Sequence, residues 1–298
     1  QKSELLEVHS MKKRRFTAAA VAATCLLTLT LAGCGGTNDV KSASEPLSAS
    51  QAFSQESVWV QYDDNDAIEK DGDIERILVF DGNGNVTAYL CNSATFADVN
   101  GLSDDEIIEL AKEQDKEVFD TRRQTAIDSN AKAIEVVQSI YDTLKEDYDN
   151  GTYATALGGT ALSDLPAGEA EGVDVEWLAS TYQEPQAQPY TLHIETDGTG
   201  NSAQSETISF DAPAYSFATV EVNDEEQDPY DVLTWGIDGS SSPAGDSITN
   251  ESIQLSPVEK QTVYDMTFGG FGGLATIVND DHAGFTFDAP DTEGIEVD

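Results

Sequence analysis

A short apolar segment behind a cluster of basic residues constrains this chain more than any other feature. Lys-Lys-Arg-Arg follows Met11, and an apolar run interrupted only by Thr and one Cys then extends from Phe16 to Ala32. A basic head, a short apolar stretch and small residues at its end are the parts of a secretory signal peptide. An uncleaved anchor helix is the alternative, but the run is shorter than the ~20 residues that a spanning helix needs. The sequence therefore predicts export.

The end of this run carries a more specific pattern. Leu31-Ala32-Gly33-Cys34 resembles the lipobox of bacterial lipoproteins, and the resemblance covers only Met11 to Cys34. It implies cleavage between Gly33 and Cys34, with the Cys34 thiol joined to diacylglycerol as a palmitate-type anchor. Two or more acyl chains hold a protein stably on a bilayer, whereas one chain holds it only marginally. We therefore expect a lipid-anchored protein on the outer, extracytoplasmic face of the cell membrane.

The residues before Met11 do not suit a signal peptide. Glu4 and Glu7 lie where a basic head is expected. Our hypothesis is that Met11 is the true start and that the first ten residues are a mis-assigned extension of the signal peptide, which ends at residue 33. The predicted mature protein is the same in either case.

The mature part is strongly acidic. Five of the 15 Lys and Arg residues and two of the 56 Asp and Glu residues precede Cys34, which leaves 10 against 54 and a net charge of −44. Such a field repels nucleic acid, so we expect no nucleic-acid partner. Capture of cations or basic peptides is one interpretation of the charge. We favour a solvated acidic surface, because the acids are spread along the chain.

Cysteine usage indicates a fold held by packing alone. Beyond the signal segment only Cys34 and Cys91 remain, and lipidation of the first leaves no intrachain disulfide. Cys91 ends a strand-like run and is most simply a small buried hydrophobe; a reactive thiol is the alternative. Hydrophobic residues make up 39% of the chain, which is enough to build a core.

The first part of the mature chain is predicted to be a flexible tether followed by a small sheet. Residues 34–56 form the lipid anchor and a Ser/Ala/Gly-rich tether with a span of roughly 25 Å. An α/β region is expected over residues 57–150. Its strands are Val58–Tyr62, Ile74–Phe80 and Val86–Cys91, the last two forming a hairpin around a Gly/Asn-rich turn.

A long helical segment follows the capping box Ser103-Asp-Asp-Glu106 and runs to about Asp149. Its apolar residues form two stripes that lie more than a third of a turn apart. One straight helix does not turn both stripes toward one core. The pattern therefore predicts two helices, or one long helix with a break or a change of packing partner between Asp120 and Thr125. Gln124–Asn130 is a second candidate for this position.

Short alternating runs dominate the rest of the chain. A linker is expected over residues 151–188, with a short helix at Val175–Ser180 and Trp177 packed on a flanking domain. Residues 189–298 are predicted to form an antiparallel β-sandwich, which gives an α+β fold class overall. Alternatively, the early strands at residues 58–91 join this sheet, and the helices form an insertion. The expected strands are Tyr190–Thr196, Glu206–Phe210, Ser216–Val222, Val232–Ile237, Ser252–Leu255, Thr262–Phe268, Leu274–Val278 and Phe285–Phe287.

Two loops share the pattern Asp-Gly-x-Gly-Asn, at residues 81–85 and 197–201. A calcium loop of the EF-hand type needs Gly at its sixth position and Glu at its twelfth, and neither loop has them. We interpret both as turns, in which Gly and Asn supply positive φ. The sequence contains no His/Cys metal spacing, and we predict neither a metal site nor a cofactor.

No catalytic motif is recognisable. The glycine-rich run Phe268–Leu274 lacks the Lys-Ser/Thr pair of a phosphate loop. Close backbone packing is one interpretation of it, and a loop that exposes Phe271 to a sugar or a peptide is the other. His193 is expected on a strand and His282 in a turn, without a Gly-x-Ser-x-Gly nucleophile motif.

These observations favour a non-catalytic, lipid-anchored protein with a binding or envelope role. Its expected partners are the membrane, through the Cys34 lipid, and a cell-wall, glycan or peptide ligand. The rival hypothesis is an extracellular hydrolase that uses paired carboxylates, which predicts two convergent acids with raised pKa values in a cleft. Solute capture for a transporter ranks last, because the alternating βαβ pattern of such proteins is missing.

Overall fold

The computed structural model describes residues 39–63, 68–150, 181–217 and 248–298. The chain divides into two units, Gln1–Gly36 and Thr37–Asp298, and all described residues belong to the second. The predicted helix at Val175–Ser180, Trp177 and the strand at Val232–Ile237 lie outside the described residues, as does all but the start of the strand at Ser216–Val222.

The described chain is mostly antiparallel β-sheet with few helices. The helices are α1 (Ala49–Phe53), α2 (Phe96–Val99) and α3 (Asp104–Asp149). The strands are β1 (Leu47–Ser48), β2 (Glu56–Gln61), β3 (Arg76–Asp81), β4 (Asn85–Leu90), β5 (Gln188–Thr196), β6 (Ala203–Pro213), β7 (Ile248–Leu255), β8 (Pro257–Val263), β9 (Met266–Phe271), β10 (Leu274–Val278), β11 (Phe285–Thr286) and β12 (Glu296–Val297).

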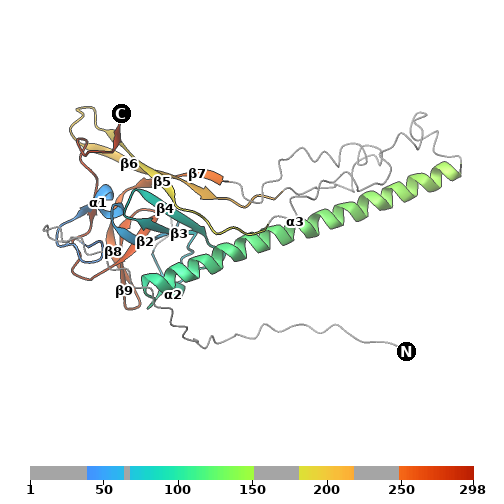
Figure 1. Cartoon of the computed structure of the whole chain (residues 1–298), viewed down its shortest axis with the longest axis horizontal. Coiled ribbons are helices and arrows are strands. Elements are labelled where there is room, and N and C mark those ends of the chain that lie inside the picture. Colours follow the sequence, from blue (N-terminus) through green and yellow to red (C-terminus); the bar gives the residue numbers. More distant parts are fainter. Residues whose placement is uncertain (1–38, 64–67, 151–180, 218–247) are drawn as a thin grey trace. The chain divides into compact units, whose positions relative to one another are not determined.

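One sheet contains strands from both of the regions that the sequence analysis separates. The strand order is β7-β6-β5-β4-β3-β2-β10-β9-β8, with β12 paired in parallel to β5 (Figure 1). The early hairpin joins later strands on both sides, because β2 pairs with β10 and β4 pairs with β5. The early strands thus belong to the same sheet as the later ones, as the alternative prediction had it. They do not form a separate N-terminal sheet.

The sheet curls into a half-barrel. In a flat sheet the four steps from β3 to β7 would place these strands about 19 Å apart, which is beyond the reach of two side chains. Arg76 Nη2 on β3 nevertheless lies 2.8 Å from Glu251 Oε1 on β7. The bend is permitted where β4 and β5 share only two register pairs, Asn85 with Pro189 and Val86 with Gln188.

The concave face of the sheet encloses an aromatic core. Phe53 of α1 stacks on Phe80 at a ring separation of 4.4 Å and meets Trp59 edge-on at 5.1 Å. Gly270 makes room for this core, because a Cβ there would lie 2.3 Å from the Leu274 carbonyl oxygen and 3.0 Å from the Trp59 ring. Phe271 is fully buried in the same core. Close backbone packing is therefore confirmed for the glycine-rich run, and the interpretation of Phe271 as an exposed binding residue is wrong.

The opposite face of the sheet is covered by α3. Alternation along the strands turns Val58, Val60 and Ile77 toward this side, where they pack with Ile107 and Ala111 of the helix. The expected break is wrong, since α3 runs from Asp104 to Asp149 without interruption. The segment contains no Pro or Gly, so its backbone hydrogen bonds continue through the point where the apolar stripe changes.

The beginning of the described chain is packed and is not the flexible tether predicted for residues 34–56. Val40, Ala43, Leu47 and Phe53 are each at most 2% exposed. The small residues that suggested flexibility fit closely: Ala49 and Ala52 of α1 are fully buried. Composition alone misses this, because Ser and Ala serve equally well in a solvated linker and in a tight packing position.

Candidate functional site

The predicted lipidation and cleavage residues, Cys34 and Gly33, lie outside the described residues. The described chain begins at Asp39, five residues after Cys34. We call Asp39–Ser48 the N-terminal strap, because it lies along the loop formed by residues 279–286. Asn279 N donates to Lys41 O at 2.7 Å, Ala283 N to Ala43 O at 2.9 Å, and Leu47 N to Gly284 O at 3.1 Å. These bonds join the residues next to the predicted anchor to the C-terminal part of the fold.

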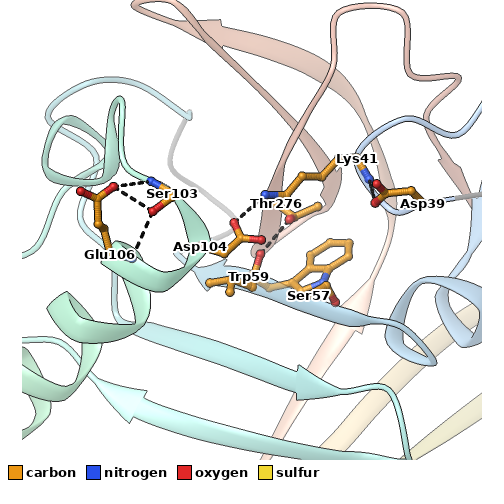
Figure 2. A network of polar contacts seen from close by, with 9 residues as sticks. Asp39, Lys41, Ser57, Trp59, Ser103, Asp104, Glu106 and Thr276 are labelled. Atoms are coloured by element: carbon orange, nitrogen blue, oxygen red, sulfur yellow. Dashed lines mark hydrogen bonds and ion pairs between the residues drawn. The ribbon is translucent and has the colours of Figure 1, made fainter. Parts of the chain in front are cut away.

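A salt bridge connects the N-terminal strap to the beginning of α3. Lys41 Nζ lies 2.6 Å from Asp104 Oδ1 at the beginning of α3, and the two side chains are 37% and 36% exposed (Figure 2). The predicted capping box is confirmed beside it, since Glu106 Oε2 accepts from Ser103 N at 2.9 Å and from Ser103 Oγ at 2.8 Å. An exposed pair of this kind contributes little to stability, so its main effect is to orient the strap.

His282 lies under the strap and is 2% exposed. Its ring stacks on Phe285 at 4.9 Å, and its Nδ1 accepts a hydrogen bond from Gly284 N at 2.9 Å. Burial lowers the pKa of His282, and the nearby charge of Lys260 lowers it further. The ring is thus a neutral packing group that shapes its turn.

The structure brings two acids together that the sequence does not single out. Glu206 on β6 is fully buried and Asp288 is 4% exposed; we call them the carboxyl pair. Glu206 Oε2 accepts from Asp288 N at 3.0 Å, while its Oε1 has no hydrogen-bond partner. Asp288 in turn accepts from Ser50 N at 2.7 Å and Ser50 Oγ at 2.6 Å, at the beginning of α1.

The carboxyl pair holds a proton at neutral pH. Burial is the main cause that raises the pKa of Glu206 to about 8, and the adjacent Asp288 carboxylate raises it further. A protonated Glu206 removes the repulsion between two buried acids. The alternation of β6 offers the one sequence signal for it, because Glu206 shares its face with the buried Ile208, Phe210 and Ala212.

A second buried acid lies on α3. Asp115 is fully buried and accepts from Leu90 N at 2.8 Å, Tyr182 Oη at 2.9 Å and Tyr215 Oη at 2.6 Å; these residues form the Asp115 cluster. Its position is readable from the sequence, since Asp115 continues the apolar stripe of Ala111 with helical spacing. The cluster fastens residues 182 and 215 to the helix, next to the segments at 151–180 and 218–247.

The surroundings of the remaining candidate residues, Cys91, His193, Asp81 and Asp197, are those of packing, strand and turn residues. Cys91 is partly buried, and burial is the main cause that raises the pKa of its thiol to about 12, which disfavours a reactive thiolate. His193 on β5 lies 3.2 Å from the Asp298 carboxylate at a partly exposed position. The Asp81 and Asp197 carboxylates accept hydrogen bonds within their own turns, from Asn83 N at 2.7 Å and from Thr199 N at 3.0 Å.

The described residues contain neither a cluster of metal ligands nor a helix suited to span a membrane. No group of three or more His, Cys, Asp and Glu side chains within the described ranges is placed to hold a metal ion. In the same part of the chain, no helix combines the length and the apolar character needed to cross a bilayer.

Comparison with known proteins adds no relative. No family model, no curated protein and no solved structure matches this chain.

Proposed function

We propose that this chain is a lipid-anchored, extracytoplasmic bacterial protein whose folded part has a binding or envelope role. The supporting observation is the position of the lipobox-like Cys34 only five residues before Asp39, where the described part of the chain begins, and Val40 there is already buried to 2% exposure. A signal peptide followed at once by a lipidated cysteine is the arrangement that the resemblance implies. The membrane is the first partner, and a cell-wall, glycan or peptide ligand is the second.

Two linked experiments test the anchor. Wild-type protein and Cys34→Ser are expressed in a bacterium fed labelled palmitate, and the cells are then fractionated. We expect label only in the wild type and loss of membrane retention in the variant. Cys91→Ser is the matched control, because it removes the other cysteine of the mature chain and is expected to leave both label and retention unchanged. Unlabelled wild-type protein, or full retention of Cys34→Ser, contradicts the proposal.

The binding role needs its own test. The protein from Gly35 onward is screened against glycans, envelope polymers and peptides, and we expect saturable binding without turnover. Reproducible turnover that is lost on mutating one site would replace this role by an enzymatic one.

One observation bears on the rival hydrolase hypothesis. The carboxyl pair has the raised pKa that such an enzyme needs, with Glu206 at about 8. Its side chains are 0% and 4% exposed, however, and their oxygens face Ser50 and the Asp288 backbone and not solvent. We therefore assign the pair to the stability of the fold. Turnover abolished by Glu206→Gln in a variant that remains folded would reverse this assignment.

A further inference from the structure

The turn between β8 and β9 carries an aromatic side chain where a glycine is expected. Val263 pairs with Met266, which leaves Tyr264 and Asp265 as the two turn residues; we call this turn the hairpin tip. Tyr264 has a φ of 54°. In a two-residue hairpin with positive φ at its first turn position, Gly is the preferred residue. The sequence prediction of one strand over Thr262–Phe268 is therefore wrong in its middle, because no Gly marks the turn.

The Tyr264 side chain does not compensate for its strained backbone by packing. It is 57% exposed, and Ile248 at 65% and Val297 at 43% are the other large hydrophobic residues that are exposed in the described part of the chain. Backbone strain that the surrounding fold does not use is an indication of function at the strained residue. A partly apolar ring with a polar hydroxyl at its end suits an interface between water and an apolar phase.

A series of contacts connects the hairpin tip to the beginning of the described chain. Gly101 N donates to Met266 Sδ at 2.8 Å, so the tip lies beside the residues that lead into α3. Asp104, three residues later, is paired with Lys41 of the N-terminal strap. Figure 1 agrees with this contact, because β9 begins close to α2 and the beginning of α3.

The distance to the predicted anchor is short. Five residue steps separate Cys34 from Asp39, and even a fully extended chain covers only about 17 Å over that length. The packed N-terminal strap thus replaces a predicted tether of roughly 25 Å by a shorter connection. A lipid on Cys34 would therefore keep Asp39 within about 17 Å of the lipidated cysteine.

We propose that the hairpin tip rests in the head-group layer of the membrane that holds Cys34, with Tyr264 as the contacting side chain. This inference rests on the proposed lipid anchor and adds an orientation to it. Lys70 lies nearby: its pKa is raised chiefly by a hydrogen bond to Asp71 and to a smaller degree by the Tyr264 phenol. Its ammonium group suits lipid phosphates, and Asp71 and Asp265 favour zwitterionic over anionic lipid.

The chemistry of the two mature cysteines makes a site-specific test possible. Cys34 is blocked as a thioether in the lipidated protein, and the pKa of Cys91 is raised to about 12, so an added cysteine is labelled selectively. Lipidated Asp265→Cys, with Tyr264 intact, is labelled with an environment-sensitive fluorophore and bound to phosphatidylcholine vesicles that contain a head-group nitroxide lipid. Ile248→Cys is the matched control, since Ile248 is also exposed and lies on a different strand.

We expect at least twofold stronger quenching at residue 265 than at residue 248. Adding Tyr264→Gly to the Asp265→Cys protein should reduce that quenching and also raise the thermal midpoint, because Gly relieves the backbone strain. A merely structural Tyr264 would not produce this combination. Adding 30% phosphatidylglycerol should weaken the quenching.

The possible failures are distinguishable. Equal quenching at residues 265 and 248 in vesicle-bound protein overturns the orientation and leaves the lipid anchor intact. Wild-type protein that does not attach to vesicles, or attaches equally well as Cys34→Ser, overturns the anchor and the orientation with it.

Discussion

Asp115 and Glu206 are both fully buried acids, yet the groups that face their carboxyl oxygens differ. Burial is the largest cause that raises the pKa of each. Around Asp115, the two tyrosine hydroxyls and Leu90 N oppose this rise by donating to the carboxylate. Glu206 accepts one backbone hydrogen bond and faces a second carboxylate. Three donors surround the first acid, whereas burial, together with the neighbouring carboxylate, keeps the second protonated.

The comparison teaches that a buried acid has no fixed effect on stability. A carboxyl group with three donors fastens several segments together, and removing it leaves those donors without their acceptor in a largely buried site. A protonated acid beside a carboxylate acts as a hydrogen-bonding neutral group, and its ionisation opposes folding. The signs of the expected mutational effects therefore differ.

The largest effect is expected for Asp115→Ala. The substitution leaves the Tyr215 and Tyr182 hydroxyls and Leu90 N without their acceptor, which should lower the free energy of unfolding by about 3–5 kcal/mol. Glu117→Ala, on an exposed turn of the same helix, is the control and should change it by less than about 0.5 kcal/mol. Urea unfolding measures both. Similar losses for the two variants would mean that the Asp115 cluster is unimportant.

Glu206→Gln is expected to act in the opposite direction. Between the unfolded pKa of 4.5 and the folded pKa of about 8, the folded protein holds a proton that the unfolded chain has released. The contribution of protonated Glu206 to the free energy of unfolding is therefore fully present below pH 4.5. It falls as the pH rises and is lost above about pH 8. Gln has no such titration, so the variant should be more stable than the wild type at pH 8.5, by roughly 2–4 kcal/mol.

The pH dependence of unfolding, measured for the wild type and for Glu206→Gln, checks this expectation. Thermal or urea unfolding at pH 5 and pH 8.5 should show a gap between wild type and Glu206→Gln that widens with pH. The exposed Glu259→Gln serves as the control, with an unchanged slope. A gap that is constant across this range would show that Glu206 does not carry the proton.

A smaller effect separates the two tyrosines of the Asp115 cluster. Tyr215 is 4% exposed and donates at 2.6 Å, whereas Tyr182 is partly exposed and donates at 2.9 Å. Tyr215→Phe should cost about 1.5–2.5 kcal/mol and Tyr182→Phe about 1 kcal/mol, because water replaces the donor more readily at the exposed site. Denaturant midpoints of the two variants give the comparison, and the reverse order would contradict it.

Local pattern predicts several elements of this fold well. The hairpin around Asp81, the capping box at Ser103 and the strand at Tyr190–Thr196 are all present, because each depends on residues close in sequence. The curl of the sheet, the pairing of β2 with β10 and the contact of Arg76 with Glu251 depend on residues far apart in the sequence. Periodicity reports which face a residue occupies and not which strand lies beside it.

The candidate sites follow the same division. Alternation places Glu206 on the buried face of β6, and helical spacing places Asp115 on the buried stripe of α3, so both acids are detectable as polar residues at core positions. Their partners are not detectable, since Asp288 and Tyr215 come from distant segments. The Tyr264 turn is missed for a different reason, because its positive φ occurs without the Gly or Asn that normally signals it.

The mass of the N-terminal peptide of the membrane-extracted protein tests the central claim most directly. The account predicts a chain that begins at Cys34 and carries a diacylglyceryl group on its sulfur, with Asp39 and the strap following intact. A chain that retains residues before Cys34, or one that begins at Cys34 with an unmodified thiol, would contradict the account.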